Sequence, residues 1–562
     1  MSQSVPGVIS GEHGIGLTKI HYLEPEKRAA FAEYKQAIDP HGHFNKGKLL
    51  QPTGKTGLDN AYTPSLRLLQ QEALILEESD LGALNDGIEH CLRCGKCKPV
   101  CMTHVPRANL LYSPRNKILA TGLIIEAFLY EEQTRRGVSL RHFDALNDVA
   151  DHCTTCHKCL NPCPVDIDFG EISIRMRALL TRQGKRKTSL GTRAALAFLN
   201  AKNARVVHFL REGLGVRGFQ AINLGHDLLN KIGLLGKKDR IPPPTTKKPS
   251  APMQTVNLVR NAVRVDLPRK TTRAMLGLED PSHIPIIRDP NQDTEQAETV
   301  FYFPGCGSER LFSQIGLATI AMLYETGAQT VLPPGYLCCG FPQTAAGNAE
   351  QGQKITTENR VLFHRIANTL NYLDIKTVIV SCGTCMDQLL KYEFESIFPN
   401  CRILDIYEYL LEKDIGLEAG ETGTTQYLYH DPCHTPIKTY TPSKVANGLI
   451  GKTVPLSDRC CGEAGTLGTA RPDIAAQLRY RKEEELREGI RSITSNTIAR
   501  NGDVKLLTTC PACQQGLSRY TDGTGLKTDY IVVEMMNVRW GKDWEKRFAD
   551  KIADGGIEKV LL

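Results

Sequence analysis

Two quartets of cysteine constrain this chain more than any other feature of its sequence. Each quartet has the spacing Cys-x2-Cys-x2-Cys-x3-Cys, and the members are Cys91, Cys94, Cys97 and Cys101, then Cys153, Cys156, Cys159 and Cys163. This spacing is typical of thiolates that hold a cubane 4Fe-4S cluster. A structural zinc site would use two separate Cys-x2-Cys pairs, and a disulfide framework is typical of small secreted domains. The quartets therefore predict two cubane clusters and a role in electron transfer.

The fourth cysteine of each quartet is expected to serve the cluster of the other quartet, as it does in two-cluster ferredoxins. Cys163 would then complete the cluster of the first three cysteines of the first quartet, and Cys101 that of the second quartet. The two quartets would form one α-helical ferredoxin domain over residues 86–181. Pro164 follows the second quartet, as is usual, whereas Met102 follows the first.

Length and composition indicate a multidomain chain of ordinary globular type. The 562 residues suffice for three or four domains, and 41% are hydrophobic and 23% charged. Nineteen cysteines fit a reducing compartment if most of them are metal thiolates. The sequence has neither a long apolar run nor the features of a signal peptide at its start. We therefore expect a cytoplasmic protein, either free or peripheral on the cytoplasmic face of the inner membrane.

The positive charge of the chain is concentrated in residues 182–240, which hold 13 Lys or Arg against 3 Asp or Glu. Within this segment, residues 193–213 and 219–238 place apolar residues at helical spacing between basic ones. Such helices either pack their apolar stripe on protein, which we favour, or make peripheral contact with a membrane. Nucleic acid is not expected as a partner, because few aromatic residues and no recognisable motif accompany the charge. We assign residues 182–298 to basic amphipathic helices and a proline-rich linker.

Beyond residue 299 short apolar runs alternate with helical stretches, which predicts α/β domains. Five cysteines recur there in the same order in two halves, over residues 299–415 and 424–540, ahead of a C-terminal tail, 541–562. The sets are Cys306, Cys338, Cys339, Cys382 and Cys385, then Cys433, Cys460, Cys461, Cys510 and Cys513. Thiols repeated at strand ends, ahead of helix N-termini that favour thiolate, predict a metal site in each half. Cys401 lies outside both sets and is expected to be structural.

These two halves resemble a known family of cysteine-rich domains. FPGCGSER, YLCCGFPQTAAG and VSCGTC, with their counterparts YHDPCH, DRCCGEAGTLG and TTCPACQQG, are similar to the paired CCG domains of the heterodisulfide reductase catalytic subunit. The same domains follow a two-cluster ferredoxin domain in iron–sulfur subunits of glycolate oxidase, anaerobic glycerol-3-phosphate dehydrogenase and lactate-utilisation complexes. The resemblance covers residues 86–540. It implies one or two CCG-type 4Fe-4S clusters, with five cysteine ligands in each half.

A second resemblance covers residues 1–55. The segments VISGEHGIGLTKIHYL and DPHGHFNKGKLLQP are similar to the C-terminal end of FAD-linked D-2-hydroxy-acid dehydrogenases of the vanillyl-alcohol-oxidase superfamily. The resemblance implies that Glu12 is a metal ligand at the substrate, His13 a catalytic base and Asn45 a cofactor-binding residue. Lys46 replaces the proline of the family motif. A flavin-binding lobe needs some hundreds of residues, so we expect FAD to be held by an upstream lobe or a flavoprotein partner.

Together these features predict a multidomain chain of the α/β plus α class. It comprises a short C-terminal remnant of an FAD-linked oxidase, an α-helical two-cluster ferredoxin domain and a duplicated α/β CCG domain. The expected function is that of the iron–sulfur module of an FAD-dependent D-2-hydroxy-acid dehydrogenase, an oxidoreductase acting on CH–OH groups. Electrons would pass from flavin through the clusters to quinone or another acceptor. Two alternatives stay open: a disulfide reductase of the heterodisulfide reductase type, and a stand-alone relay subunit of a flavoprotein complex.

Overall fold

The computed structural model describes residues 23–43, 80–104, 110–133, 140–235, 241–245, 248–292, 297–418, 420–463, 466–500 and 502–562. Glu12, His13 and Asn45, which the sequence singles out, lie outside this set. The chain divides into two units. The first takes its described residues from 1–96, 118–142 and 163–167, and the second from 97–117, 143–162 and 168–562.

The described part of the chain before residue 280 is helical. The helices are α2 (Pro25–Ile38), α5 (Asp80–Asp86), η2 (Leu110–Tyr112), α6 (Pro114–Gln133), α7 (Leu140–Asp151) and α8 (Phe169–Arg182). The cysteine quartets lie in the loops that follow α5 and α7. Helix α8 begins where Asp168 accepts a hydrogen bond from the Gly170 N–H, as an N-cap residue does. Its buried residues recur at helical spacing, so that one face packs on protein.

The basic region forms α9 (Leu190–Asn200), α10 (Ala204–Leu210), η3 (Arg211–Arg217), α11 (Gly218–Lys231), α12 (Ala251–Val259) and α13 (Thr272–Leu276). The segment η3 is π-helical and joins α10 to α11. Arg211 is buried and donates hydrogen bonds to the carbonyl oxygens of Arg310, 2.8 Å, and Arg269, 3.3 Å. Part of this region therefore packs on protein. No described helix is long and apolar enough to cross a membrane.

The first CCG half contains a six-stranded sheet of order β10-β1-β3-β2-β4-β5. Its strands are β1 (His283–Ile287), β2 (Thr299–Phe303), β3 (Gln329–Val331), β4 (Ile375–Val380), β5 (Arg402–Asp405) and β10 (Ile557–Leu561). Strands β2 to β5 pair in parallel, whereas β1 is antiparallel to both β3 and β10. The associated helices are η4 (Gly307–Leu311), α14 (Ser313–Glu325), α15 (Phe341–Ala346), α16 (Ala349–Thr369), α17 (Gly383–Leu389), η5 (Leu390–Tyr392), η6 (Phe394–Ser396) and α18 (Ile406–Glu412).

The second half repeats this arrangement with a four-stranded parallel sheet of order β7-β6-β8-β9. Its strands are β6 (Gln426–His430), β7 (Leu456–Ser457), β8 (Val504–Thr508) and β9 (Lys527–Tyr530). Its helices are α19 (Pro442–Ile450), α20 (Leu467–Ala470), α21 (Pro472–Thr494), α22 (Pro511–Leu517), η7 (Ser518–Tyr520), α23 (Thr521–Thr524), α24 (Ile531–Trp540) and α25 (Trp544–Ala553). The strand order equals that of β3-β2-β4-β5, which confirms the predicted fold class and its duplication.

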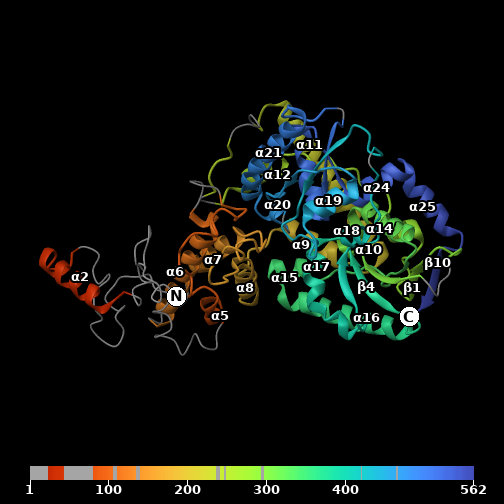
Figure 1. Ribbon diagram of the computed structural model, residues 1–562. Helices are drawn as coiled ribbons and strands as arrows, with labels where there is room; N and C mark the ends of the chain where they lie inside the picture. The colour runs from red at the N-terminus through yellow and green to blue at the C-terminus, as the bar shows by residue number, and fades with distance from the viewer. Residues whose placement is uncertain are drawn as a thin grey trace. The chain divides into compact units, whose positions relative to one another are not determined.

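The C-terminal segment, treated as a tail in the sequence, returns to the first half. After α25 the chain forms β10, which pairs with β1 from His283↔Leu561 to Ile287↔Ile557 (Figure 1). Strand β10 therefore covers β1 and forms one edge of the first sheet.

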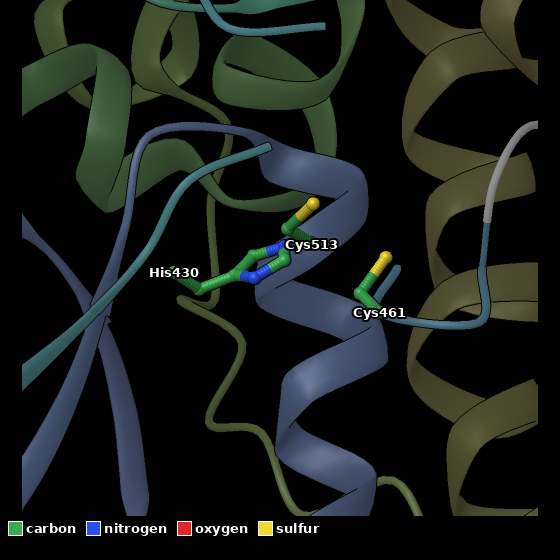
Figure 2. A group of neighbouring side chains, drawn as sticks. All are labelled: His430, Cys461 and Cys513. Atoms are coloured by element: carbon green, nitrogen blue, oxygen red, sulfur yellow. The ribbon is translucent and has the colours of Figure 1, made fainter. Parts of the chain in front are cut away.

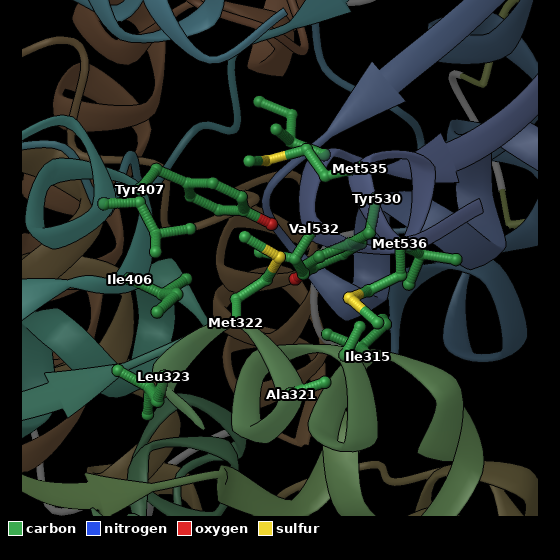
Figure 3. Packing of buried hydrophobic residues seen from close by; sticks show 14 of the residues in the cluster. Ile315, Ala321, Met322, Leu323, Ile406, Tyr407, Tyr530, Val532, Met535 and Met536 are labelled. Carbon is green, nitrogen blue, oxygen red and sulfur yellow. The ribbon is translucent and has the colours of Figure 1, made fainter. Parts of the chain in front are cut away.

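The two halves share one hydrophobic core. Met322 of α14 lies against Val532 and Met535 of α24, and Tyr407 and Tyr530 lie beside them (Figure 3). Burial of these large side chains contributes about 1.5–3 kcal/mol each. The rings of Tyr407 and Tyr530 are 6.3 Å apart, and the Tyr530 hydroxyl donates to the Ser381 carbonyl at 3.0 Å. Because Ser381 precedes Cys382, this core fixes one cysteine set relative to the other.

Candidate metal centres

Both ferredoxin quartets wind the chain in the same way around their second cysteine. Arg93 and Gly95, which flank Cys94, have φ angles of +54° and +81°. Thr155 and His157, which flank Cys156, have φ angles of +51° and +56°. Such angles are uncommon for residues with a side chain and cluster at functional sites. The repeated conformation indicates that the two loops serve equivalent centres.

In the first unit, Cys163 lies near the start of the first quartet. Burial raises the pKa of the Cys91 thiol, and the charges of Cys163 and Cys94 add to this rise. The Ile167 N–H donates to the Cys163 sulfur at 3.3 Å, as backbone amides do toward cluster thiolates. Proximity of Cys163 to Cys91 is the arrangement that crossed ligation requires.

In the second unit, Cys101 lies near the second quartet. Burial raises the pKa of Cys156 to about 11, and the charges of Cys153 and Cys101 contribute. Burial also raises the pKa of Cys159 to about 12, with Cys153 as the next cause. Thiols grouped in this way repel one another as thiolates, so a bound cation is needed to hold them deprotonated. The grouping suits a metal centre and supports the proposed role of Cys101 as its fourth ligand.

The five cysteines of the first CCG half form one connected group. Cys306 follows β2, Cys338 and Cys339 precede α15, and Cys382 is the N-cap residue of α17, with Cys385 in its first turn. The sulfur atoms of Cys306 and Cys338 are 3.9 Å apart. Cys339 contacts Cys385, which in turn contacts Cys382.

In the first half, the neighbours of Cys338 favour its thiolate form. Hydrogen bonds from Cys306 and Cys339 hold the pKa of Cys338 well below its usual range, and the Arg310 guanidinium lowers it further. Arg310 is fully buried and donates to the Phe198 carbonyl at 2.8 Å, so its charge is fixed beside the cysteines.

The second half repeats the group with Cys433, Cys460, Cys461, Cys513 and Cys510 linked in the same order. Hydrogen bonds from Cys433 and Cys461 hold the pKa of Cys460 well below its usual range, and here Lys482 supplies the cation. The Gly462 N–H donates to the Cys460 sulfur at 3.4 Å. Each half therefore places one thiolate next to a buried positive charge, which stabilises the bound form of an anionic cluster.

Glycine follows each cysteine pair because the chain turns there in the left-handed region. Gly340 and Gly462 have φ angles of +91° and +87°. Close packing imposes a further constraint at Gly305, where a Cβ would lie 2.7 Å from the Cys385 sulfur.

The two cysteine sets meet across a pseudo-two-fold axis. Cys382 and Cys510 occupy equivalent positions and form a thiol hydrogen bond with each other. A Cβ on Gly383 would overlap the His434 carbonyl oxygen, and a Cβ on Gly307 would lie 2.6 Å from Pro511 Cβ. These two contacts are equivalent, since each joins the residue after a first cysteine to the residue after a fourth cysteine of the other half.

The second ferredoxin quartet adjoins the second CCG half, within the second unit. Met102, the residue that replaces proline after Cys101, accepts a hydrogen bond from the Cys460 N–H at its sulfur, 3.3 Å away. His434 Nε2 lies 2.8 Å from the Thr155 carbonyl oxygen, and His434 Nδ1 lies 2.5 Å from Asp387 Oδ2. This adjacency suits electron transfer between a cubane and a CCG centre, because the transfer rate falls steeply with distance.

Sequence reasoning missed His430, which lies with Cys461 and Cys513 (Figure 2). One ring nitrogen of His430 and the two sulfur atoms lie within 4.8 Å of one another, and all three residues are buried. Alignment of the two repeats could have shown it, because His430 replaces Phe303 of the first half. By contrast, Cys401 stands apart from both groups, and burial raises the pKa of its thiol to about 11.

Four family models match segments of the chain. A 4Fe-4S dicluster domain matches residues 87–167, and a cysteine-rich domain of the CCG type matches 300–390 and 427–518. The C-terminal domain of FAD linked oxidases matches residues 3–49, and a domain of unknown function matches 518–562. No solved structure matches the chain.

Relatives include components of several oxidoreductases. One component of the fumarate reductase (CoM/CoB) of Methanothermobacter marburgensis is 26% identical over 43% of the chain and 46% of its own length. The glycolate oxidase iron-sulfur subunit of Escherichia coli is 23% identical over 75% of the chain and 89% of its own length. One component of the dihydromethanophenazine:CoB–CoM heterodisulfide reductase of Methanosarcina barkeri is 22% identical over 85% of the chain and 97% of its own length. The chain thus spans about half the length of the first of these and most of the other two.

The fold and the two kinds of cysteine site define an iron–sulfur electron-transfer protein. The chain combines a segment similar to FAD-linked oxidases, a 4Fe-4S dicluster domain and two CCG-type cysteine-rich domains, and it is similar to iron–sulfur components of several oxidoreductases. These findings confirm the family resemblance, the iron–sulfur clusters as cofactors and the electron-transfer role.

Proposed function

We propose that this chain is the iron–sulfur part of a flavin-dependent dehydrogenase that oxidises D-2-hydroxy acids. The observation that carries the proposal is the FAD-linked oxidase segment at residues 3–49, in the same chain as the ferredoxin and CCG domains. The Escherichia coli relative, named as a glycolate oxidase iron-sulfur subunit, supports the same substrate class. The FAD would be held by a further lobe of the enzyme or by a flavoprotein partner.

The cysteines would form two kinds of iron–sulfur centre, cubanes in the ferredoxin domain and CCG centres in the two halves. Cys91, Cys94, Cys97 and Cys163 would hold one cubane, and Cys101, Cys153, Cys156 and Cys159 the other. Each set of five CCG cysteines would hold a further 4Fe-4S centre. The clusters, when bound, accept and donate single electrons. The protein contributes the thiolates, the buried charges of Arg310 and Lys482, and the short separation of neighbouring sites.

The substrate chemistry would lie in the oxidase segment. Glu12 would bind a metal ion that orients the substrate's carboxylate and hydroxyl, and His13 would accept the hydroxyl proton while the hydride on the same carbon passes to FAD. The hydroxy acid then loses two electrons and becomes a 2-oxo acid. Asn45 would contribute to binding the cofactor. The family match over these residues supports the assignment.

Quinone at a membrane surface is the acceptor we propose. Several apolar side chains of α10, α11 and the turn after it are exposed, among them Phe209 at 76%, Leu224 at 72% and Leu234 at 65%. Exposed cations, Arg205 and Lys231, lie on the same helices. Such a surface can bind anionic lipid, with about 1 kcal/mol from each cation near the membrane.

Vesicle co-sedimentation tests this part of the proposal. The protein should bind anionic vesicles at low salt and release near 0.15 M salt, where the screening length is about 8 Å. The variant Arg205→Glu/Lys231→Glu should bind much less. Arg211 is unsuitable for charge reversal because it is buried, so Lys376→Glu on the exposed side of β4 serves as the control and should bind normally. Equal binding to neutral vesicles, or none at low salt, would favour a soluble acceptor.

The function itself is tested with the complete enzyme, including its flavin-binding part. Adding D-lactate, glycolate or D-2-hydroxyglutarate under anaerobic conditions should bleach the flavin and produce electron paramagnetic resonance (EPR) signals of reduced clusters. His13→Ala should slow both events by about 10²-fold or more. Flavin reduction without reduced clusters would contradict the relay.

Disulfide reduction is the second candidate function. It is favoured by the relative named as part of a heterodisulfide reductase and by the contact between Cys382 and Cys510, which brings the two CCG centres together. Reduced protein that cleaves a thiol-derived disulfide but takes no electrons from a hydroxy acid would support this candidate instead.

A further inference from the structure

The two CCG halves differ at one position beside their cysteines. Phe303 ends β2 and His430 ends β6, and each precedes the first cysteine of its set by three residues. Phe303 is fully buried and packs edge-on against Phe363, with ring centroids 6.1 Å apart. His430 is fully buried at the equivalent place, but it has no such aromatic contact among the described residues.

The environment of His430 is polar on one side of the ring. Nδ1 lies 2.9 Å from the Ser457 carbonyl oxygen and 3.1 Å from Lys482 Nζ. Lys482 also donates to the Ser457 hydroxyl and to Glu485 Oε2, the latter at 2.7 Å. Nε2 has no hydrogen-bond partner among the described residues, although its atom is buried. A buried polar atom without a partner costs folding free energy, so a bound ligand at Nε2 would stabilise the site.

The position of this ring matches that of a metal ligand. A histidine ligand typically donates its other ring N–H to a carbonyl oxygen, which fixes the tautomer and leaves the second nitrogen free to bind metal. The Ser457 carbonyl oxygen is placed to accept from a protonated Nδ1. In that tautomer Lys482 does not donate to Nδ1 and directs its N–H groups to the Ser457 hydroxyl and Glu485. A metal–sulfur bond of about 2.3 Å and a metal–nitrogen bond of about 2.0 Å put tetrahedral ligand atoms about 3.5–3.8 Å apart. The grouping of the ring with Cys461 and Cys513 within 4.8 Å accommodates such a set (Figure 2).

We propose that His430 Nε2 is an iron ligand of the second CCG centre, in addition to its five cysteines. The inference rests on the proposed binding of a cluster by those cysteines. The first half cannot do the same, because Phe303 offers no donor atom. Both centres would keep five thiolates, and the neutral imidazole would add a ligand to the second centre without changing its charge. In Rieske clusters, histidine in place of cysteine raises the reduction potential. A thiolate in place of the His430 imidazole should accordingly lower the potential of the second centre.

The test is pulsed EPR of anaerobic, partly reduced protein labelled with ¹⁵N-histidine. The wild-type signal of the second centre should show a strongly coupled histidine nitrogen. His430→Gln should abolish this coupling, and His434→Gln should keep it. His434 is the matched control because it also lies beside the second set, next to Cys433. A wild-type cluster without a strongly coupled nitrogen, or a coupling that survives in His430→Gln, would overturn the proposal.

A second variant separates the loss of the histidine ligand from the loss of the whole cluster. His430→Cys supplies a sixth thiolate, so it should retain the iron, lose the nitrogen coupling and titrate at a lower potential than wild type. An unchanged potential would contradict ligation by His430. Iron content distinguishes this failure from failure of the cluster assignment. About sixteen irons per chain without nitrogen coupling would contradict only the ligand role of His430. About eight irons per chain would contradict the CCG clusters on which the inference rests.

Discussion

Cys433 of the second CCG half lies beside Cys156 of the second ferredoxin quartet. The pKa of Cys433 is raised well above its usual range by its hydrogen bond to Cys460 and by burial, and the charge of Cys156 adds to the rise. His434 joins the same two segments through the Thr155 carbonyl oxygen, and Met102, which follows Cys101 of the first quartet, accepts a hydrogen bond from the Cys460 N–H. Clusters bound at these two cysteine sets would therefore be neighbours, which would give electrons a short route from the second cubane to the second CCG centre.

This proximity predicts magnetic interaction between two reduced clusters. In fully reduced protein, the EPR signal of the second cubane should be broadened or split by the second CCG centre. Cys433→Ser should remove the broadening because it disrupts that centre. Cys306→Ser, the equivalent change in the first half, should leave it in place. The reverse pattern would place the second cubane next to the first CCG half and would contradict this prediction.

Crossed ligation predicts that replacing the fourth cysteine of one quartet damages the cluster of the other quartet. Cys101→Ser should chiefly affect the cluster of Cys153, Cys156 and Cys159, and Cys163→Ser the cluster of the first quartet. The contribution of Cys101 to the raised pKa of Cys156, and of Cys163 to that of Cys91, supports this pattern. EPR of the two reduced variants should show that they lose different signals. Loss of the local cluster in each variant would refute the crossing.

The close approach of the two halves predicts a large effect at Gly383. Alanine there would overlap the His434 carbonyl oxygen, so Gly383→Ala should destabilise the protein by about 1–3 kcal/mol or more. Gly213→Ala is the control, since nothing lies within 4 Å of its added methyl group. That variant should be neutral or gain up to about 1 kcal/mol. Anaerobic denaturant titrations measure both, and equal stability of the two variants would contradict the packing.

Much of this architecture follows from local sequence signals. The quartets carry their own ligand spacing, and the repeated cysteine order reveals the duplication before any strand is placed. Met102 shows the limit of such signals: its partner at Cys460 lies 358 residues away, so nothing local to Met102 indicates the contact. The pairing of β10 with β1 is hidden for the same reason. His430 escaped notice because a single histidine carries no spacing pattern, and only comparison with Phe303 sets it apart.

Burial of Asp405 predicts a pH-dependent stability. Burial raises the pKa of this carboxyl well above its usual value near 3.8, although its Oδ1 accepts the Tyr407 N–H at 2.9 Å. Because the folded-state pKa exceeds the unfolded one, stability falls as pH rises from about 4 toward the folded-state pKa. Asp405→Asn keeps the cap and removes the charge, so it should be more stable than wild type at pH 7 and lose less stability between pH 5 and 7.

Unfolding midpoints at several pH values measure this effect. Asp405→Ala serves as the comparison, because it removes the charge and the helix cap together. The loss of the cap alone should cost about 0.5–2 kcal/mol, so alanine should be less stable than asparagine at every pH. A wild-type protein that gains stability from pH 5 to 7 relative to Asp405→Asn would show that the carboxylate is favourably solvated.

Iron and sulfide analysis of the anaerobically purified chain tests the central claim most directly. Two cubanes and two CCG centres predict about sixteen irons per chain, with little zinc. A variant with serine at Cys338, Cys339, Cys460 and Cys461 should fall to about eight irons and retain the cubane signals. A wild-type content of about eight irons, unchanged in that variant, would contradict the account by showing that the paired cysteine-rich domains hold no iron–sulfur centre.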